Sequence, residues 1–319
     1  MKKWLWGLAL ILILSIAGIY ILIPGRIIVS AFSAIQCTPN AVFRTLSTED
    51  KWKIWFPQGN RAYNSTQAEA KDKFTYKRDT YQITNKFPNT IELLISEEDG
   101  TVIKSSINIL QLPENASAIH WQCELVAGLN PISRIFQYVS AQKIKNNMTD
   151  LLDYMHSFLE KKENVYGMSI EIASTKDTVL VATKSVLSAY PSTTEIYDLI
   201  AVLKNYIAKQ KALVTGYPML NISPLNDNKF EMMVAIPVNR VLEGENNIFP
   251  KRMIPGNFVI SQIKGGSYTI IQAEKQMELY FQDNSKVAMA IPFQYLITDR
   301  VKEPDTSKWI TKLYAPVFR

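Results

Sequence analysis

The chain opens with an unbroken run of uncharged, mostly apolar residues from Trp4 to Ile23. A run of ~20 apolar residues can cross a bilayer, and a backbone in hydrocarbon must be helical because its polar groups can bond only to one another. The two lysines before the run outnumber the single Arg26 after it, which places the N-terminus in the cytoplasm and the rest outside. A cleaved signal peptide is the alternative, but its apolar region spans only ~7–15 residues. We therefore expect residues 1–25 to form a single-pass membrane anchor.

Apolar and polar residues alternate over residues 73–126, the period of strands that bury one face. Pro, Gly, Asn and Asp interrupt the alternation, which predicts antiparallel strands joined by tight turns. From Pro131 the apolar spacing changes to three and four, so a long helix should follow. Upstream, Thr38 as N-cap and Pro39 in the first turn predict the start of a short helix. A curved antiparallel sheet against a long helix is an α+β arrangement, which we expect over residues 26–164.

This first segment resembles the SRPBCC superfamily, also called START-like or polyketide-cyclase-like. The resemblance lies in the order of elements and in two motifs, Thr38-Pro39-x-x-Val42-Phe43 and Trp52-x-x-Trp55-Phe56-Pro57. It implies a helix-grip fold with a deep apolar cavity between sheet and long helix, in which most members bind a hydrophobic small molecule. A minority are cyclases or hydrolases. The side chains that could line such a cavity, or simply fill the core, are Phe74, Tyr76, Trp121, Met155 and Phe158.

The second segment, residues 165–319, nearly repeats itself. Each half contains a strand, a helix, a strand led by a proline and a strand that ends in a proline. Two such halves sharing one sheet would bury a face that neither could cover alone. We therefore expect a second α+β domain with a duplicated β-α-β-β pattern. The corresponding prolines are Pro218 and Pro237 in the first half and Pro292 and Pro316 in the second.

The duplicated pattern resembles the GyrI-like domain, the effector-binding module of AraC-type and multidrug-responsive transcription regulators. Its best markers are the repeated proline strands and Gly265-Gly266-Ser267-Tyr268 after a strand. The resemblance implies a groove between the halves that binds small, often hydrophobic or cationic molecules through aromatic rings and a carboxylate. The residues that could line this groove, or pack in the core, are Tyr190, Tyr217, Tyr268, Gln294, Tyr295, Trp309 and Tyr314.

One position departs from the family pattern. Gln294 stands near the place where the family often has a glutamate. Glutamine can hydrogen-bond but cannot neutralise a cation, which favours a neutral ligand. A helix-turn-helix segment does not precede the domain, so we expect no nucleic acid partner.

Composition narrows the chemistry further. The formal net charge is +6, and half of it comes from Lys2, Lys3 and Arg26 at the expected anchor. The balance that remains is too even to indicate nucleic acid binding. Two cysteines and two histidines argue against a Cys/His zinc site and against a Ser-His-Asp or Cys-His nucleophile. We expect no catalytic residue, no metal and no cofactor.

Three functions remain open. The first is a membrane-anchored, non-catalytic protein that binds small hydrophobic molecules through one or both domains. The second is a cyclase-like or hydrolase-like enzyme, whose candidate acids and bases are His120, Glu171 and Glu195. The third is a structural or sensory subunit of an envelope complex. Ligand identity, protein partners, oligomeric state and any pairing of Cys37 with Cys123 are open in all three.

Overall fold

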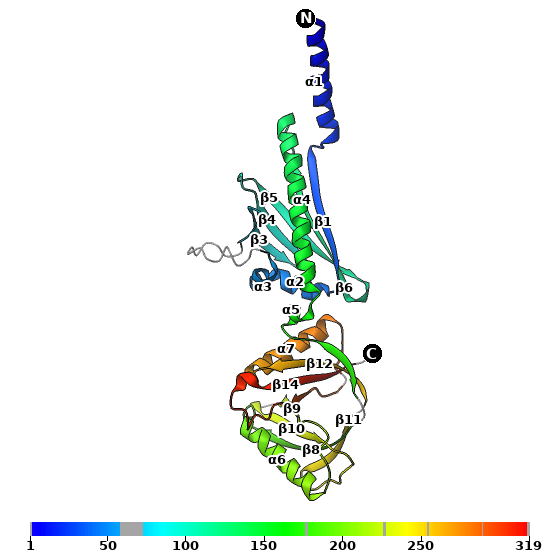
Figure 1. Cartoon of the computed structure of the whole chain (residues 1–319), viewed down its shortest axis with the longest axis vertical. Coiled ribbons are helices and arrows are strands. Elements are labelled where there is room, and N and C mark those ends of the chain that lie inside the picture. The colour runs from blue at the N-terminus through cyan, green and yellow to red at the C-terminus, as the bar shows by residue number, and fades with distance from the viewer. Residues whose placement is uncertain are drawn as a thin grey trace. The chain divides into compact units, whose positions relative to one another are not determined.

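The computed structural model describes residues 2–57, 73–175, 178–225, 228–253, 255–288 and 290–317. The chain divides into two compact units, Met1–Lys161 and Lys162–Arg319. Over the described residues, the fold consists of seven α-helices and two antiparallel sheets (Figure 1). The expected α+β class is confirmed at this level.

The first element is the helix α1 (Lys2–Leu22). Within the part of the chain that the structure describes, no helix is both long enough and apolar enough to cross a membrane. The prediction of a single-pass anchor, with a cytoplasmic N-terminus and extracytoplasmic domains, is therefore wrong.

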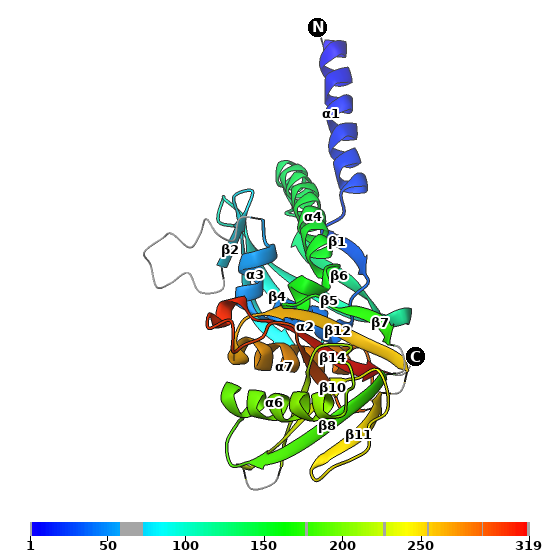
Figure 2. The same cartoon turned by 60° about the horizontal axis from the view of Figure 1, so that its bottom comes forward.

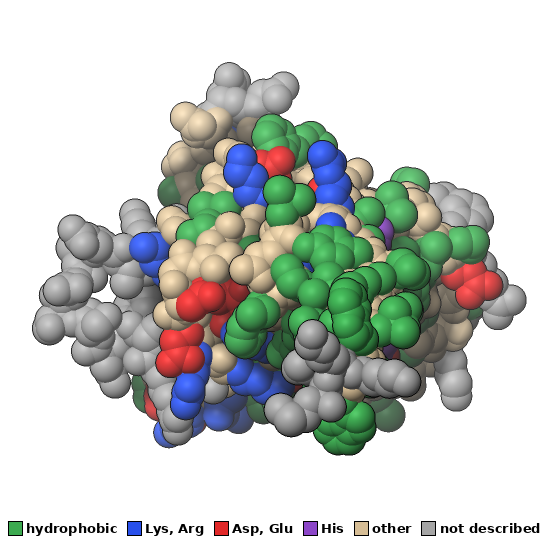
Figure 3. Space-filling model, turned by 90° about the horizontal axis from the view of Figure 1, so that it is seen from above, with side chains coloured by type: hydrophobic (Ala, Val, Ile, Leu, Met, Phe, Trp, Pro, Cys, Tyr) green, Lys and Arg blue, Asp and Glu red, His purple; other side chains and the backbone are tan. Residues whose placement is uncertain are grey.

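Apolar side chains of α1 are nonetheless exposed, and they gather with other hydrophobic side chains in the view down onto this end of the molecule (Figure 3). The end of α1 contacts the start of the long helix α4 (Pro131–Leu159). There the guanidinium of Arg134 lies 4.4 Å from the ring centroid of Tyr20. The same side chain donates a hydrogen bond to the carbonyl oxygen of Ile23 at 2.9 Å.

The first unit contains a six-stranded sheet in the order β1-β6-β5-β4-β3-β2, and α4 lies lengthwise along it (Figure 1). Every neighbouring pair of strands is antiparallel. Its elements are β1 (Arg26–Ile35), α2 (Pro39–Ser47), α3 (Glu49–Trp55), β2 (Lys73–Tyr76), β3 (Asp79–Phe87), β4 (Thr90–Ser96), β5 (Val102–Leu112), a 3-10 turn at Pro113–Asn115, β6 (Ala116–Val126) and α4 (Pro131–Leu159).

The residues of this unit explain most of its boundaries. In β4 the buried positions Ile91, Leu93 and Ile95 alternate with less buried ones, so one face of the strand packs in the core. The Asn130 side chain accepts a hydrogen bond from the backbone N–H of Ile132 at 2.8 Å and caps α4. The predicted cap of α2 is different. Helix α2 does start at Pro39, but the buried hydroxyl of Thr38 makes no capping hydrogen bond.

The second unit contains an eight-stranded sheet in the order β11-β8-β10-β9-β13-β14-β12-β7. The order β-α-β-β occurs twice, first as β8-α6-β9-β10 and then as β12-α7-β13-β14, and the two halves meet where β9 pairs with β13. The elements are α5 (Lys162–Tyr166), β7 (Glu171–Thr175), β8 (Thr178–Leu187), α6 (Thr193–Lys209), β9 (Met219–Pro224), β10 (Phe230–Pro237), β11 (Ile248–Met253), β12 (Gly256–Lys264), α7 (Ser267–Asp283), β13 (Phe293–Leu296), a 3-10 turn at Thr306–Lys308 and β14 (Ile310–Val317).

Helices α6 and α7 cover the same face of this sheet (Figure 2). On β13, Leu296 packs in the apolar cluster under α6, and Gln294, two residues earlier, bonds to Glu274 of α7. Residues two apart on a strand point to the same face, so both helices lie on that side. The other face carries a smaller apolar cluster with Met219 and Phe293 at its centre. That second face holds the candidate site.

Helix α6 begins at a pair of reciprocal hydrogen bonds between Ser192 and Glu195. The hydroxyl of Ser192 accepts a hydrogen bond from the backbone N–H of Glu195. In return, the Glu195 carboxylate accepts one from the backbone N–H of Ser192 at 2.8 Å. This reciprocal pair is a capping box, which satisfies N–H groups that the first helical turn leaves free.

Candidate ligand-binding cleft

A cleft of about 980 Å³ lies on the face of the second sheet that the two helices leave uncovered. Its size falls within the range typical of small-molecule sites, roughly 300–1,000 Å³. It draws on both halves of the repeat and on the two edge strands. Its lining residues are Ser174, Thr175, Leu180, Met219, Leu220, Asn221, Met233, Ala235, Lys251, Arg252, Met253, Pro255, Gly256, Asn257, Phe258, Ala290, Ile291, Phe293, Pro316 and Val317.

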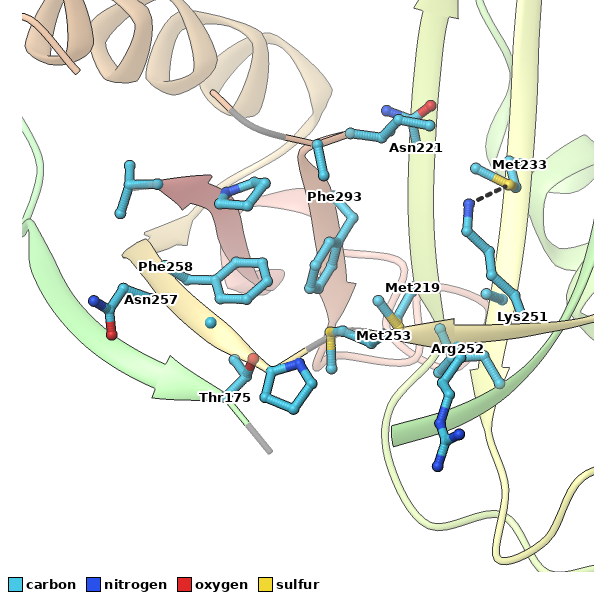
Figure 4. A pocket seen from close by; sticks show the side chains of 18 of the residues that line it. Thr175, Met219, Asn221, Met233, Lys251, Arg252, Met253, Asn257, Phe258 and Phe293 are labelled. Carbon is cyan, nitrogen blue, oxygen red and sulfur yellow. Dashed lines mark hydrogen bonds between the residues drawn. The ribbon is translucent and has the colours of Figure 1, made fainter. Parts of the chain in front are cut away.

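The walls of the cleft are mainly apolar. Figure 4 shows the rings of Phe258 and Phe293 next to each other, with the thioethers of Met219 and Met253 below them. The two ring centroids are 5.8 Å apart in an edge-on arrangement. Phe293 also stacks on the ring of Tyr314, with the two ring centroids 5.1 Å apart. These rigid rings give the cleft a preformed apolar surface.

Most polar groups of the lining are already engaged with one another. The amide of Asn221 donates to the carbonyl oxygen of Pro292 at 2.9 Å. The hydroxyl of Ser174 donates to the side-chain oxygen of Asn257 at 2.6 Å. The ammonium of Lys251 lies 3.4 Å from the sulfur of Met233, the contact drawn as a dashed line in Figure 4.

The lining determines what this site can do chemically. Its two charged residues, Lys251 and Arg252, are both cationic, and the described lining contains no carboxylate, imidazole or thiol. Such a surface can hold an apolar molecule and orient a polar end. Its candidate nucleophiles are the hydroxyls of Ser174 and Thr175 and the amine of Lys251, and the described lining holds no histidine or carboxylate beside them to act as a general base.

None of the seven residues predicted for the groove lines this cleft, although two pack directly behind it. Tyr295 and Tyr314 contact each other with centroids 5.0 Å apart, and both contact Phe293. Desolvation raises the pKa of both phenols. These two tyrosines contact Phe293 and so support the wall of the cleft without lining it.

Three other predicted residues lie on exposed surface, away from the cleft lining. They are Tyr190, Tyr217 and Tyr268, of which Tyr268 is 76% exposed. Tyr190 makes an edge-on contact with Phe230 at 5.7 Å.

The last two predicted residues, Gln294 and Trp309, lie on the helix-covered face, in a polar group that the sequence did not reveal. Gln294 donates to the Glu274 carboxylate at 2.9 Å. The indole of Trp309 donates to the Glu303 carbonyl oxygen, and the Arg300 guanidinium lies 4.8 Å from the Trp309 ring centroid. Gln294 thus bonds to a glutamate on the neighbouring helix.

Desolvation affects both charged members of this group. It raises the pKa of the Glu274 carboxyl, and the hydrogen bond from Gln294 only partly opposes that effect. It lowers the pKa of the Arg300 guanidinium, which donates to the Thr311 hydroxyl at 3.0 Å.

In the first unit, the five residues predicted to line a cavity are all at most 8% exposed and pack in the core. The ring of Phe74 lies 5.1 Å from Trp52, and Trp121 lies 5.8 Å from Tyr81. The five residues are Phe74, Tyr76, Trp121, Met155 and Phe158. The first three of them pack in this aromatic cluster.

The candidate acids and bases of the enzyme hypothesis do not form a common site. Glu195 belongs to the capping box, Glu171 is exposed at the start of an edge strand, and His120 lies on β6 of the other unit. Cys37 and Cys123 are both buried, and no disulfide joins them in the structure. Among the described residues, no group of three or more His, Cys, Asp or Glu could hold a metal ion.

The sequence analysis named none of the residues that line the cleft, including those on the edge strands β7 and β11. These strands contribute Ser174, Thr175, Lys251, Arg252 and Met253 to the lining. A usable signal was present in β11, where Ile248, Phe249 and Met253 are apolar. Pro250 and two adjacent cations interrupt that pattern, so it did not predict a strand.

Comparison with known proteins gives structural likenesses only. No family model and no curated protein matches the chain. Similar solved structures include the EcmrR–DNA complex, at 18% identity and a TM-score of 0.45, with 60% of this chain and 73% of that chain covered. Another is SAV2435 bound to tetraphenylphosphonium, at 15% identity and a TM-score of 0.31, covering 47% and 94%. A hydrolase from Listeria innocua follows at 10% identity and a TM-score of 0.36, covering 47% and 92%.

Similarities this low establish neither a family nor a ligand. The expected lack of a nucleic acid partner stays a prediction. The functional argument therefore rests on the cleft itself.

Proposed function

We propose that the second domain, residues 165–319, is a GyrI-like binding module that holds a small hydrophobic molecule in the cleft opposite α6 and α7, without catalysing a reaction. The observation that carries this proposal is the cleft itself, with a volume of about 980 Å³ and walls formed by Phe258, Phe293, Met219 and Met253. Burying apolar surface contributes roughly 25 cal/mol per Å², so a medium-sized apolar molecule gains enough free energy to bind.

Both halves of the repeat contribute to the lining. Leu180, Met219 and Met233 come from the first half, and Phe258 and Phe293 come from the second. A ligand in this position contacts both halves at once. This supports the inference that the duplication serves binding.

Binding can be tested with a neutral probe, decanol, by isothermal titration calorimetry on the full chain. Ile291 lines the cleft and is 50% exposed, so Ile291→Glu should place a charge in the site without disturbing the core. We expect this variant to lose at least tenfold in decanol affinity, because the charge must be desolvated when the ligand binds.

The matched control is Val301→Glu, which changes an exposed apolar residue of the same unit outside the cleft lining. It should bind decanol like the parent protein. Equal losses in both variants, or a parent chain that binds neither decanol nor another ten-carbon amphiphile, would rule out this cleft as the binding site.

A further inference from the structure

The cleft has an uneven distribution of charge. Its apolar floor lies beside two cations, Lys251 and Arg252, whereas the described lining contains no acidic residue. An apolar site that carries positive charge favours a ligand that brings the opposite charge.

Of the two cations, Lys251 faces the cleft. Side chains alternate along a strand, and in β11 both Phe249 and Met253 pack in the apolar cluster on the cleft side of the sheet. Lys251 lies between them in register and therefore shares their face. Arg252 belongs to the opposite set, and Figure 4 shows its guanidinium pointing away from the rings of Phe258 and Phe293.

The Lys251 ammonium is poorly compensated. Its hydrogen-bond partner within the described residues is the thioether sulfur of Met233, 3.4 Å away. A thioether is a weak acceptor, whereas an ammonium carries three strong donors. At least two N–H donors of the Lys251 ammonium therefore remain available. The side chain is half-buried at the wall of the apolar cleft.

We propose that the ligand of this cleft is an acidic amphiphile, a small apolar molecule that ends in a carboxylate or another singly charged acid group. Its apolar part lies against Phe258, Phe293 and Met253, and its acid group accepts hydrogen bonds from Lys251. This inference rests on the proposed binding function and specifies the class of ligand. It also reverses the preference for a neutral ligand that Gln294 suggested, because Gln294 faces α7 and does not line the cleft.

The test compares three probes that share a ten-carbon chain and differ in charge: decanoate, decanol and decyltrimethylammonium. Each is titrated calorimetrically into the full chain at pH 7, below its aggregation concentration. A charge-assisted hydrogen bond in a partly desolvated site should make decanoate bind about tenfold more tightly than decanol. The ammonium probe should bind more weakly than decanol.

Lys251→Met should remove the advantage of decanoate, about tenfold, and leave decanol affinity within twofold of the parent. Lys251→Arg should restore most of the decanoate affinity. Lys204→Met, which removes an exposed lysine from α6 on the other face of the sheet, is the matched control and should change neither probe.

The possible failures are distinguishable. If none of the three probes binds, the proposed binding function is wrong. If decanol binds but decanoate binds no better, or if Lys251→Met weakens both probes equally, the binding function stands and the acidic ligand class is overturned. Preferential binding of decyltrimethylammonium would overturn the ligand class as well.

Discussion

Lys143 lies between two carboxylates that protein atoms largely cover. Its ammonium is 2.7 Å from Asp79 Oδ1 and 3.2 Å from Glu97 Oε1, and these two acidic side chains are 0% and 8% exposed. Lys143→Met would leave two buried negative charges without a cation. We expect a loss of about 2–3 kcal/mol in the free energy of unfolding at pH 7, less than for a fully buried pair because Lys143 itself is 41% exposed.

Urea denaturation measures this loss, and Lys145→Met on the exposed side of the same helix should stay within about 0.5 kcal/mol of the parent. The penalty should shrink at acidic pH. Burial already raises the pKa of Asp79, and a protonated carboxyl needs no cation. A penalty that is equal at pH 4 and pH 7 would contradict this explanation.

Glu274 should make stability depend on pH in one direction. Burial raises the pKa of its carboxyl above the unfolded value of 4.5, so between these two pKa values the folded state binds more protons than the unfolded state. The contribution of Glu274 to stability therefore falls as pH rises through this window. Glu274→Gln, which can keep the hydrogen bond from Gln294, should melt at the same temperature as the parent at pH 4 and at a slightly higher temperature at pH 7. The difference is small because Glu274 as a whole residue is exposed to solvent, which screens the charged carboxylate.

The matched control is Glu278→Gln, at an exposed position of the same helix. It should shift the melting temperature equally at both pH values. A Glu274→Gln variant that is less stable than the parent at pH 7 would show that the charged carboxylate stabilises the fold.

At the scale of elements, helix α7 depends on the turn before it. Gly265 has φ +141°, and a Cβ at this residue would lie 2.7 Å from the hydroxyl of Thr269 in the first turn of the helix. Thr269 is β-branched and has little freedom to move away. Gly265→Ala should therefore cost about 1–3 kcal/mol. In contrast, a Cβ at Gly256 meets nothing within 4 Å, so Gly256→Ala should be nearly neutral in the same urea titration.

Whether an element could be predicted from the sequence depended on how many of its faces are buried. Strands β3 to β6 each have a partner on both sides and one buried face, so strict alternation marked them clearly. The edge strands β7 and β11 pair on one side only, and Pro250 with the adjacent charges hides the period of β11. In the second unit, the sequence therefore predicted the repeated strands and helices but missed the edge strand β11. It missed Lys251 and Met253 with that strand, and both residues line the cleft.

Alternation also explains why Gln294 does not line this cleft. Consecutive residues of a strand point to opposite faces, so Gln294 cannot share a face with Phe293 and Tyr295. The sequence alone did not reveal which face the helices cover. The structure places Gln294 under α7 and Phe293 in the cleft.

At the scale of the whole molecule, the intact fold protects both cysteine thiols from reagents in solution. The chain has two cysteines, and both are buried. Burial also raises the pKa of Cys123 to about 12, so very little thiolate forms at neutral pH. Native protein should show almost no fast reaction with Ellman's reagent, and denatured protein should show two reactive thiols. A fast-reacting thiol in the native protein would contradict the burial of these side chains.

The seam between β9 and β13 joins the halves of the second sheet through two described register pairs, Tyr295 with Met219 and Gln294 with Leu220. The backbone N–H of Leu296 also donates to the carbonyl oxygen of Pro218 across it, and the hydrogen bond from Asn221 to Pro292 reinforces this line. This is a short seam for a sheet of eight strands. We predict that the sheet is most compliant along this line, and that a molecule bound in the cleft stiffens it because the lining belongs to both halves.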